Sequence, residues 1–260
     1  MRIRTLGLTA NERTIKLLIA RQREAALDIK EEQVLGGSVE SHWYYRSKAM
    51  VLRQVLRGID FHKVLDIGAG SGVFSKILVK QHGVEAICVD PAYEQETRTE
   101  MVAGRPVRFV RKVPPNGADL VLLMDVLEHV DDDVALLREA VRGAAPRAHV
   151  LVSVPAFQSL FSAHDRFLGH RRRYTLRQIE ATVAKSGLEV LRSRYFFAFL
   201  LPVATAVRVL QRSDIPKSNL RRHSAPINAL FVLLHKLELG LSRGNRLGGL
   251  SVFCLARKLQ

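Results

Sequence analysis

The chain of 260 residues is short of cysteine, of acidic residues and of long apolar runs. Its two cysteines, Cys88 and Cys254, each lie in a strand-like segment, which argues against a disulfide framework and favours buried thiols in a reducing compartment. No apolar run approaches the roughly 20 residues that cross a bilayer. The first residues, MRIRTLGLTANER, lack the apolar core of a signal peptide. We therefore expect a cytoplasmic protein.

Acidic residues are outnumbered, with 25 Asp and Glu against 40 Lys and Arg, and the formal net charge is +15. A basic surface favours anionic partners such as nucleic acid, phosphorylated substrates or acidic lipid head groups. A cationic surface without a specific partner is the alternative. Apolar residues make up 47% of the chain and charged residues 25%, which is typical of a folded domain.

Short apolar segments alternate with helical patterns through most of the chain. Alternation of this kind indicates βαβ units and a parallel sheet covered on both faces. We predict an α/β, Rossmann-like fold whose seven-stranded, mostly parallel sheet carries an N-terminal helical lid and a helical insertion before the last strand. The predicted strands cover 64–68, 86–90, 107–110, 118–125, 149–155, 188–196 and 250–257.

The same patterns divide the chain into four predicted parts. Helices over 11–33 and 41–56 would form the lid, and apolar segments at 199–210 and 227–241 would form the insertion. The parts are the lid (1–57), the α/β core (58–197), the apolar and basic insertion (198–248) and the final strand of the core sheet (249–260).

The most informative turn is VLDIGAGSG, residues 64–72, where a strand runs into three glycines at alternate positions. Such a loop lets the backbone approach a ligand closely at the start of the next helix. Val73 stands where the dinucleotide fingerprint has its third glycine, and Asp66 would repel a pyrophosphate, so a hydride-transferring oxidoreductase is disfavoured. Asp90 ends the next strand, where a carboxylate suits a ribose diol.

The segments DIGAGSG, VDP and DLVLLMDVLEHV, in this order and spacing, resemble the class I S-adenosylmethionine-dependent methyltransferases, bacterial and similar to type 11, over about 60–197. The resemblance implies that S-adenosylmethionine is the cofactor and that 58–197 binds it. Gly68 and Gly70 would meet its methionine portion and Asp90 its ribose. RKVPP stands where many members carry an acid after the third strand. The full set of expected cofactor contacts is Asp66, Gly68, Ala69, Gly70, Gly72, Asp90, Pro91, Met124, Asp125, Tyr45 and Arg46.

Candidate catalytic residues follow the fourth and fifth predicted strands, because the cofactor lies at the carboxyl ends of the strands. DVLEH follows the fourth strand and HDRFLGHRRRY, residues 164–174, follows the fifth. A hydroxyl acceptor needs its proton removed by a base of near-neutral pKa. We expect His129 and His170 to handle that proton or orient the acceptor, with His164 and Asp165 in support. A packing role for His129 is the alternative.

A metal is the less favoured interpretation of the same residues. Ubiquinone-pathway O-methyltransferases and small-RNA terminal 2′-O-methyltransferases carry a similar E-x-x-E-H segment that binds a divalent ion, and the RNA enzymes add a later histidine. By this resemblance Asp125, Glu128, His129 and His170 would be the ligands. Here an Asp replaces the first Glu, and metal-free members share the pattern.

Arginines 166 and 171–173 suit a phosphate or carboxylate on the substrate, or else they balance nearby acids. The insertion is apolar and bordered by basic residues. It could be a lid over a greasy substrate, a homodimer interface or a surface for an anionic membrane. We favour the membrane over 199–246, because each Lys or Arg near an acidic surface contributes about 1 kcal/mol.

The predicted function is transfer of a methyl group from S-adenosylmethionine to a hydroxyl oxygen of a small-molecule, glycan or lipid-linked substrate that is anionic. The alternatives are an RNA methyltransferase, metal-assisted at the 2′-oxygen, and a catalytically silent membrane-associated scaffold. Nucleic acid is disfavoured as a partner, because the aromatic residues do not interleave with the basic ones as a stacking platform would.

Overall fold

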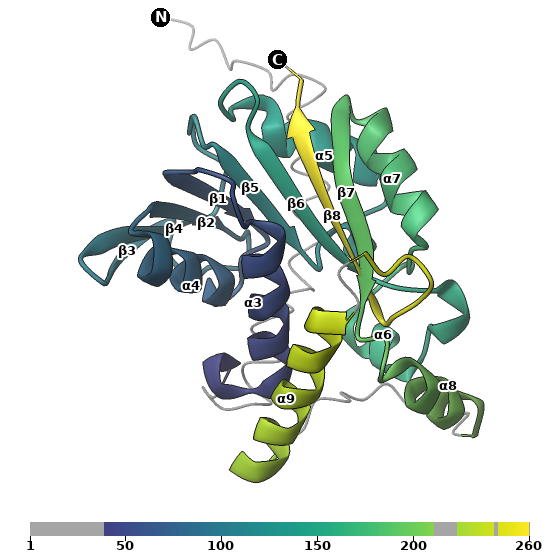
Figure 1. Ribbon diagram of the computed structural model, residues 1–260. Coiled ribbons are helices and arrows are strands. Elements are labelled where there is room, and N and C mark those ends of the chain that lie inside the picture. Colours follow the sequence, from purple (N-terminus) through teal and green to yellow (C-terminus); the bar gives the residue numbers. More distant parts are fainter. Residues whose placement is uncertain (1–38, 211–222, 242–243, 260) are drawn as a thin grey trace, which may run out of the picture.

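A computed structural model describes residues 39–210, 223–241 and 244–259, and the helix predicted over 11–33 lies outside these ranges. The described strands form one eight-stranded sheet in the order β3-β4-β2-β1-β5-β6-β8-β7 (Figure 1). The strands are β1 (Lys63–Ile67), β2 (Glu85–Val89), β3 (Thr97–Val102), β4 (Arg105–Val110), β5 (Leu120–Met124), β6 (His149–Pro155), β7 (Leu188–Phe196) and β8 (Ser251–Lys258).

The predicted Rossmann-like fold is confirmed, but the predicted count of seven strands is wrong by one. Strands β4, β2, β1, β5 and β6 pair in parallel, whereas β3 and β8 run antiparallel to their neighbours. The missed strand is β3. It lies at the edge of the sheet and its residues are mostly exposed, so it lacks the apolar pattern of the other strands. Ala103 and Gly104, both at positive φ, form the two-residue turn that joins it to β4.

Two apolar layers cover the two faces of the sheet. On one face, side chains such as Val64 and Leu122 pack against α3 (Trp43–Val55) and α4 (Val73–His82). On the other, neighbours such as Leu65 and Val121 pack against α5 (Asp133–Arg142) and α7 (Leu176–Lys185). Residues next to one another along a strand therefore both face a core, which explains the continuous apolar runs in the sequence.

Local signals set where the helices begin. The Asp132 carboxylate accepts a hydrogen bond from the Ala135 N–H at 2.8 Å at the start of α5. Thr175 and Gln178 form a reciprocal capping box at the start of α7. These caps fix the directions in which the chain leaves the segments after β5 and β6, where the candidate catalytic residues lie.

The carboxyl ends of the parallel strands carry three further helices, α6 (Ala163–Leu168), α8 (Leu201–Leu210) and α9 (Ala225–Leu241). Figure 1 shows all three at this edge of the sheet, with α9 beside α3. Helices α8 and α9 occupy the chain between β7 and β8. Among the described residues, no helix has both the length and the apolar character needed to cross a membrane.

Candidate functional site

The glycine loop lies between the end of β1 and the start of α4. Gly68, Gly70 and Gly72 all have φ between 51° and 70°, which a side chain would strain. A Cβ on Gly68 would lie 2.8 Å from Val126 Cγ2, and a Cβ on Gly72 would lie 3.0 Å from Cys88 Sγ. The alternating glycines are therefore required both by the turn and by the packing beneath it.

The glycine loop and the strand before it contain two buried polar groups. Burial raises the pKa of Asp66 to about 7, although the Ser75 hydroxyl donates to its carboxylate at 2.7 Å. The Ser71 hydroxyl, in the loop itself, is buried without a hydrogen-bond partner among the described residues. A buried hydroxyl of this kind needs a partner. The loop thus fits a polar ligand group at its centre.

Asp90 follows β2 directly and faces the same loop. Its carboxylate accepts from the Gly70 N–H at 3.2 Å and the Ala92 N–H at 2.8 Å, and burial raises its pKa. Ala69 is buried in the loop and Pro91 is half-buried beside Asp90. The residues expected to hold the methionine and ribose portions of S-adenosylmethionine thus lie together at one edge of the sheet, and the donor set fits that cofactor.

The end of β5 adds an ion pair between a buried lysine and a half-buried aspartate. Met124 is buried, and Asp125, at φ 58°, pairs with the Lys48 ammonium. The Asp125 carboxylate also accepts from the Ser153 hydroxyl at 3.1 Å and from the Tyr44 hydroxyl at 3.4 Å. Helix α3 is therefore tied to the carboxyl ends of β5 and β6 by charge as well as by packing.

The expected contacts of Tyr45 and Arg46, in α3, with the cofactor stay a prediction. Tyr45 is buried in the core with its ring 6.0 Å from that of Phe74, and Arg46 is exposed. Their neighbours Tyr44 and Lys48 reach Asp125. The aromatic pattern of HWYYR indicated that this helix matters but not which of its faces points to the site.

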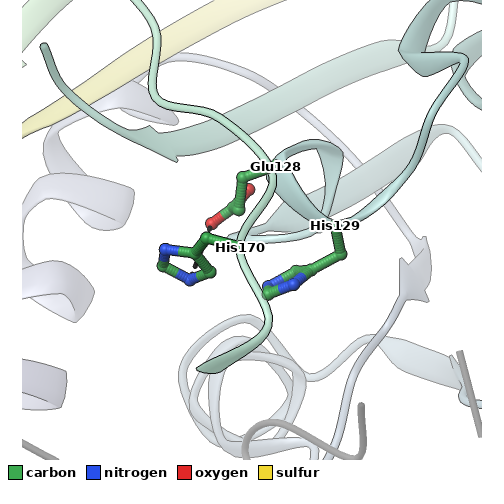
Figure 2. A group of neighbouring side chains, drawn as sticks. All are labelled: Glu128, His129 and His170. Atoms are coloured by element: carbon green, nitrogen blue, oxygen red, sulfur yellow. Dashed lines mark ion pairs between the residues drawn. The ribbon is translucent and has the colours of Figure 1, made fainter. Parts of the chain in front are cut away.

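A second group gathers one turn beyond Asp125. Glu128 and His129 lie in a short 3-10 turn over Leu127–His129, and His170 follows α6. Figure 2 shows the Glu128 carboxylate and the two imidazoles facing one another. One ligand atom from each of the three lies within 4.8 Å of the others, and the two rings are 4.7 Å apart between centroids. Asp125, the fourth expected metal ligand, is not in this group because it pairs with Lys48.

Glu128 is the least satisfied side chain of the group. It is fully buried, and neither carboxylate oxygen has a hydrogen-bond partner among the described residues. His170 Nε2 lies 3.9 Å from Oε1, beyond hydrogen-bonding distance. Burial and the nearby Asp125 charge raise the pKa of Glu128 well above its usual value. A carboxyl group in this state is suited to a bound proton, a donor from a ligand or a cation.

His170 is oriented by a buried acid. Its Nδ1 lies 2.8 Å from Asp165 Oδ1, so with Nδ1 protonated the Nε2 atom faces Glu128 and His129. The Arg173 guanidinium binds both Asp165 oxygens, at 2.7 and 3.0 Å. Burial alone would raise the pKa of Asp165, but the His170 and Arg173 contacts hold it below its usual range.

The other basic side chains of this segment mostly contact the protein. Arg171 donates to the His129 carbonyl at 2.8 Å and Arg172 to the Val130 carbonyl at 3.0 Å. Arg171 also pairs with Asp131. Arginines 171–173 thus hold the segments that follow β5 and β6 together. Burial lowers the pKa of His164, in α6 beside Asp165, to about 4.

One residue of this site was not expected from the sequence. Lys48 is a helical lysine with no motif around it, and it lies 77 positions from Asp125 along the chain. Its only signal was a charge next to an aromatic cluster. Arg173 was expected either to bind an anionic substrate or to balance nearby acids, and the structure buries it against Asp165.

Comparisons with known proteins identify the family and the fold of the chain. The model of a family described as "Methyltransferase domain" matches residues 23–193. A ubiquinone biosynthesis O-methyltransferase from Aliivibrio fischeri is 30% identical over 106 residues, which cover 37% of this chain and 45% of that protein. The chain spans about half the length of the curated relatives it matches.

Two solved structures have a similar fold. A SAM-dependent methyltransferase from Archaeoglobus fulgidus has a TM-score of 0.51 at 17% identity, covering 88% of this chain and 99% of that one. Phosphoethanolamine N-methyltransferase 2 from Haemonchus contortus, in complex with S-adenosyl-L-methionine, has a TM-score of 0.50 at 17% identity, covering 82% and 52%.

Proposed function

The chain belongs to the class I S-adenosylmethionine-dependent methyltransferases, and we propose that it methylates a hydroxyl oxygen of a small-molecule or lipid-linked acceptor. When bound, the cofactor supplies an electrophilic methyl group on a sulfonium. The protein has to place the acceptor oxygen in line with that group and take up its proton. The observation that carries the proposal is the group of Glu128, His129 and His170 one turn beyond Asp125.

In this proposal His170 is the base. Asp165 fixes its Nδ1 and leaves Nε2 to accept the acceptor's proton, an arrangement in which the acid orients the base and stabilises its charged form. Arg173 keeps Asp165 in position through two hydrogen bonds. His129 and Glu128 would bind the acceptor hydroxyl, and Glu128 would gain the hydrogen bond it lacks in the protein. His164 supports this group through its position next to Asp165.

Methylation at oxygen is supported by the names of the curated relatives, which are O-methyltransferases. The base is also needed more for an alcohol or phenol than for an amine, which is nucleophilic once neutral. The partner that binds the exposed surface of α8 and α9 decides between a free small-molecule acceptor and one carried by a lipid.

A second candidate is metal-assisted methylation of a vicinal diol, including the 2′-oxygen of RNA. One carboxylate and two imidazoles are donors that suit a divalent transition-metal ion, so Glu128, His129 and His170 fit one. A bound ion would act as a Lewis acid toward the acceptor hydroxyl. Asp125 would first have to leave Lys48 to complete the set expected from the sequence.

The first test is calorimetric titration with S-adenosylhomocysteine, with and without a chelator. We expect micromolar binding that is lost in Asp90→Ala and retained in Glu94→Ala, which removes an exposed acid four residues later. Loss of binding on chelation would favour the metal-assisted candidate. If no form of the protein binds S-adenosylhomocysteine, the proposed function is wrong.

The second part of the test uses labelled S-adenosylmethionine and a panel of phenols, catechols and sugars. We expect His170→Ala to lower turnover by about 10²- to 10⁴-fold while S-adenosylhomocysteine still binds. His62→Ala, which removes an exposed imidazole, should leave turnover unchanged. A product methylated at nitrogen or carbon, or full activity in His170→Ala, would contradict the proposal.

A further inference from the structure

Helix α9 buries polar side chains and exposes apolar ones, the reverse of an ordinary surface helix. The face that packs on α3 carries His235 and Glu238, whose side chains are 0% and 1% exposed. The opposite face carries Leu230, Leu237 and Leu241, which are 64%, 54% and 78% exposed. A surface helix of a globular protein normally turns its apolar stripe inward and its polar face to water. An apolar outer face of this size indicates a surface that is covered by a partner.

Helix α8 also exposes apolar side chains. Val203 and Val207 are 61% and 44% exposed and lie four residues apart, and Phe199 continues the row one turn earlier. Helices α8 and α9 both lie at the carboxyl edge of the sheet (Figure 1), and each exposes apolar residues there. We name these exposed residues the α8–α9 face, which consists of Phe199, Val203, Val207, Ile227, Leu230, Leu233, Leu237 and Leu241.

The segment that carries this face has a sequence rich in basic residues and poor in acids. Residues 199–246 contain only two acids, Asp214 and Glu238, and Glu238 is buried against the backbone of Ala198. Of the charged side chains of α9, Lys236 is the exposed one. The basic residues of the segment are Arg208, Arg212, Lys217, Arg221, Arg222, Lys236, Arg243 and Arg246.

We propose that the α8–α9 face docks on an anionic lipid bilayer, with both helices lying in the plane of the interface. An apolar helical face bordered by basic residues gains affinity both from buried apolar area and from acidic head groups. With 17 residues, α9 is too short and too polar on its inner face to cross the bilayer. The methylene chain of Lys236 can lie along the apolar residues while its ammonium group reaches the lipid head groups.

A second copy of the chain fits this face less well. Each copy of the chain carries a formal net charge of +15, and like charges brought together across a two-fold interface are repelled. A bilayer containing phosphatidylserine offers the opposite charge to every basic residue at once. Charge complementarity therefore favours lipid over a homodimer.

Docking in this way would turn the site toward the lipid. Arg208 of α8 lies close enough to Asp165 and Arg173 for their charges to affect its pKa. In α9, His235 contacts Ser47, next to Lys48 of the Asp125 ion pair, at 3.1 Å. Both helices thus border the edge where the acceptor has to enter. If the proposed function holds, docking in this orientation assigns the acceptor as a hydroxyl group of a lipid-linked molecule. The docking itself does not depend on methyl transfer.

The test is flotation of the full chain with vesicles of phosphatidylcholine alone or with added phosphatidylserine. We expect binding only to the anionic vesicles, and weaker binding as salt rises. The double variant Leu230→Gln/Leu237→Gln keeps the charge and should weaken binding by about tenfold or more. The matched control Met101→Gln/Leu191→Gln changes two exposed apolar side chains on strands and should bind as the parent does.

Folding of each variant is checked by its titration with S-adenosylhomocysteine, which involves none of the changed residues. Equal vesicle binding by parent and α8–α9 variant would overturn the docking proposal. So would a dimer in sedimentation that the two glutamines abolish, because the face would then belong to a second copy. Vesicle binding without S-adenosylhomocysteine binding would leave the docking standing and reject the proposed function.

Discussion

The helices that cover the sheet and the helices at its carboxyl edge distribute polarity in opposite ways. Helix α7 buries Ile179 and Val183 against the sheet and exposes Arg177 and Lys185. Helix α9 buries a histidine and a glutamate and exposes a row of leucines. The first arrangement is what folding in water selects, because apolar area is removed from solvent. The second is stable only because specific contacts hold its inner face.

Those contacts are aromatic and polar. The Trp43 ring stacks on Phe231 at 4.8 Å between centroids and on His235 at 5.4 Å. The Trp43 N–H of the backbone donates to the Asn228 side chain at 3.0 Å. Helix α3 therefore stands between the two regions, with its apolar side in the core and the start of the helix against α9.

The largest expected difference between the two regions is the loss of unfolding free energy when one leucine in each is replaced by alanine. Leu137→Ala in α5 should lower the free energy of unfolding by about 2–5 kcal/mol, since Leu137 is fully buried. Leu233→Ala in α9 should change it by less than about 0.5 kcal/mol, because Leu233 is 53% exposed. Urea unfolding followed by circular dichroism measures both. Equal losses would mean that the α8–α9 face is covered within the protein.

A smaller effect is expected from the polar inner face of α9. The Glu238 carboxylate accepts the Ala198 N–H at 2.8 Å where β7 leads into α8. Glu238→Ala should cost about 1–3 kcal/mol in unfolding free energy, because a buried donor loses its partner. Glu238→Gln keeps an acceptor and should recover most of that loss. If the two variants unfold alike, Glu238 does not hold α9 through this hydrogen bond.

The smallest expected effect is a pH dependence at the same inner face. Burial lowers the pKa of His235 to about 4. The unfolded chain binds this proton near pH 6.5, so stability from neutral His235 is present above that pH and is lost as the pH falls toward 4. The parent should lose about 1–2 kcal/mol more than His235→Gln between pH 7 and pH 4.5. His62→Gln, at an exposed imidazole, serves as the control and should follow the parent.

Sequence patterns predicted the donor side of the site well, because its residues are neighbours along the chain. The strand, glycine loop and helix of 64–82 are one continuous unit, and Asp90 ends the next strand. Seven of the eight described strands also followed from apolar segments that alternate with helical patterns. Strand β3 was missed because an edge strand need not be apolar. It joins the sheet through its antiparallel pairing with β4, which sets Thr97 opposite Val110.

The acceptor side depended on contacts between distant residues. Glu128 and His129 were expected near His170, and the structure brings these three together. It does not bring Asp125 to them, because Lys48 of α3 lies closer. Arginines 171–173 carry the charge expected for an anionic substrate, yet they contact carbonyls and acids of the protein. The sequence shows which side chains are charged, but it does not show which groups they contact.

The sequence by itself determined the family, the sheet and the cofactor loop, since local patterns of strand, glycine and helix set them. The tertiary structure alone decided which face of each helix is inside. A helical period separates two faces of α9 without stating which one packs, and only contact with Trp43 and Ser47 turns the polar face inward. The physical reason is that one segment alone sets its helical period, whereas burial of a helix face requires contact with a second segment.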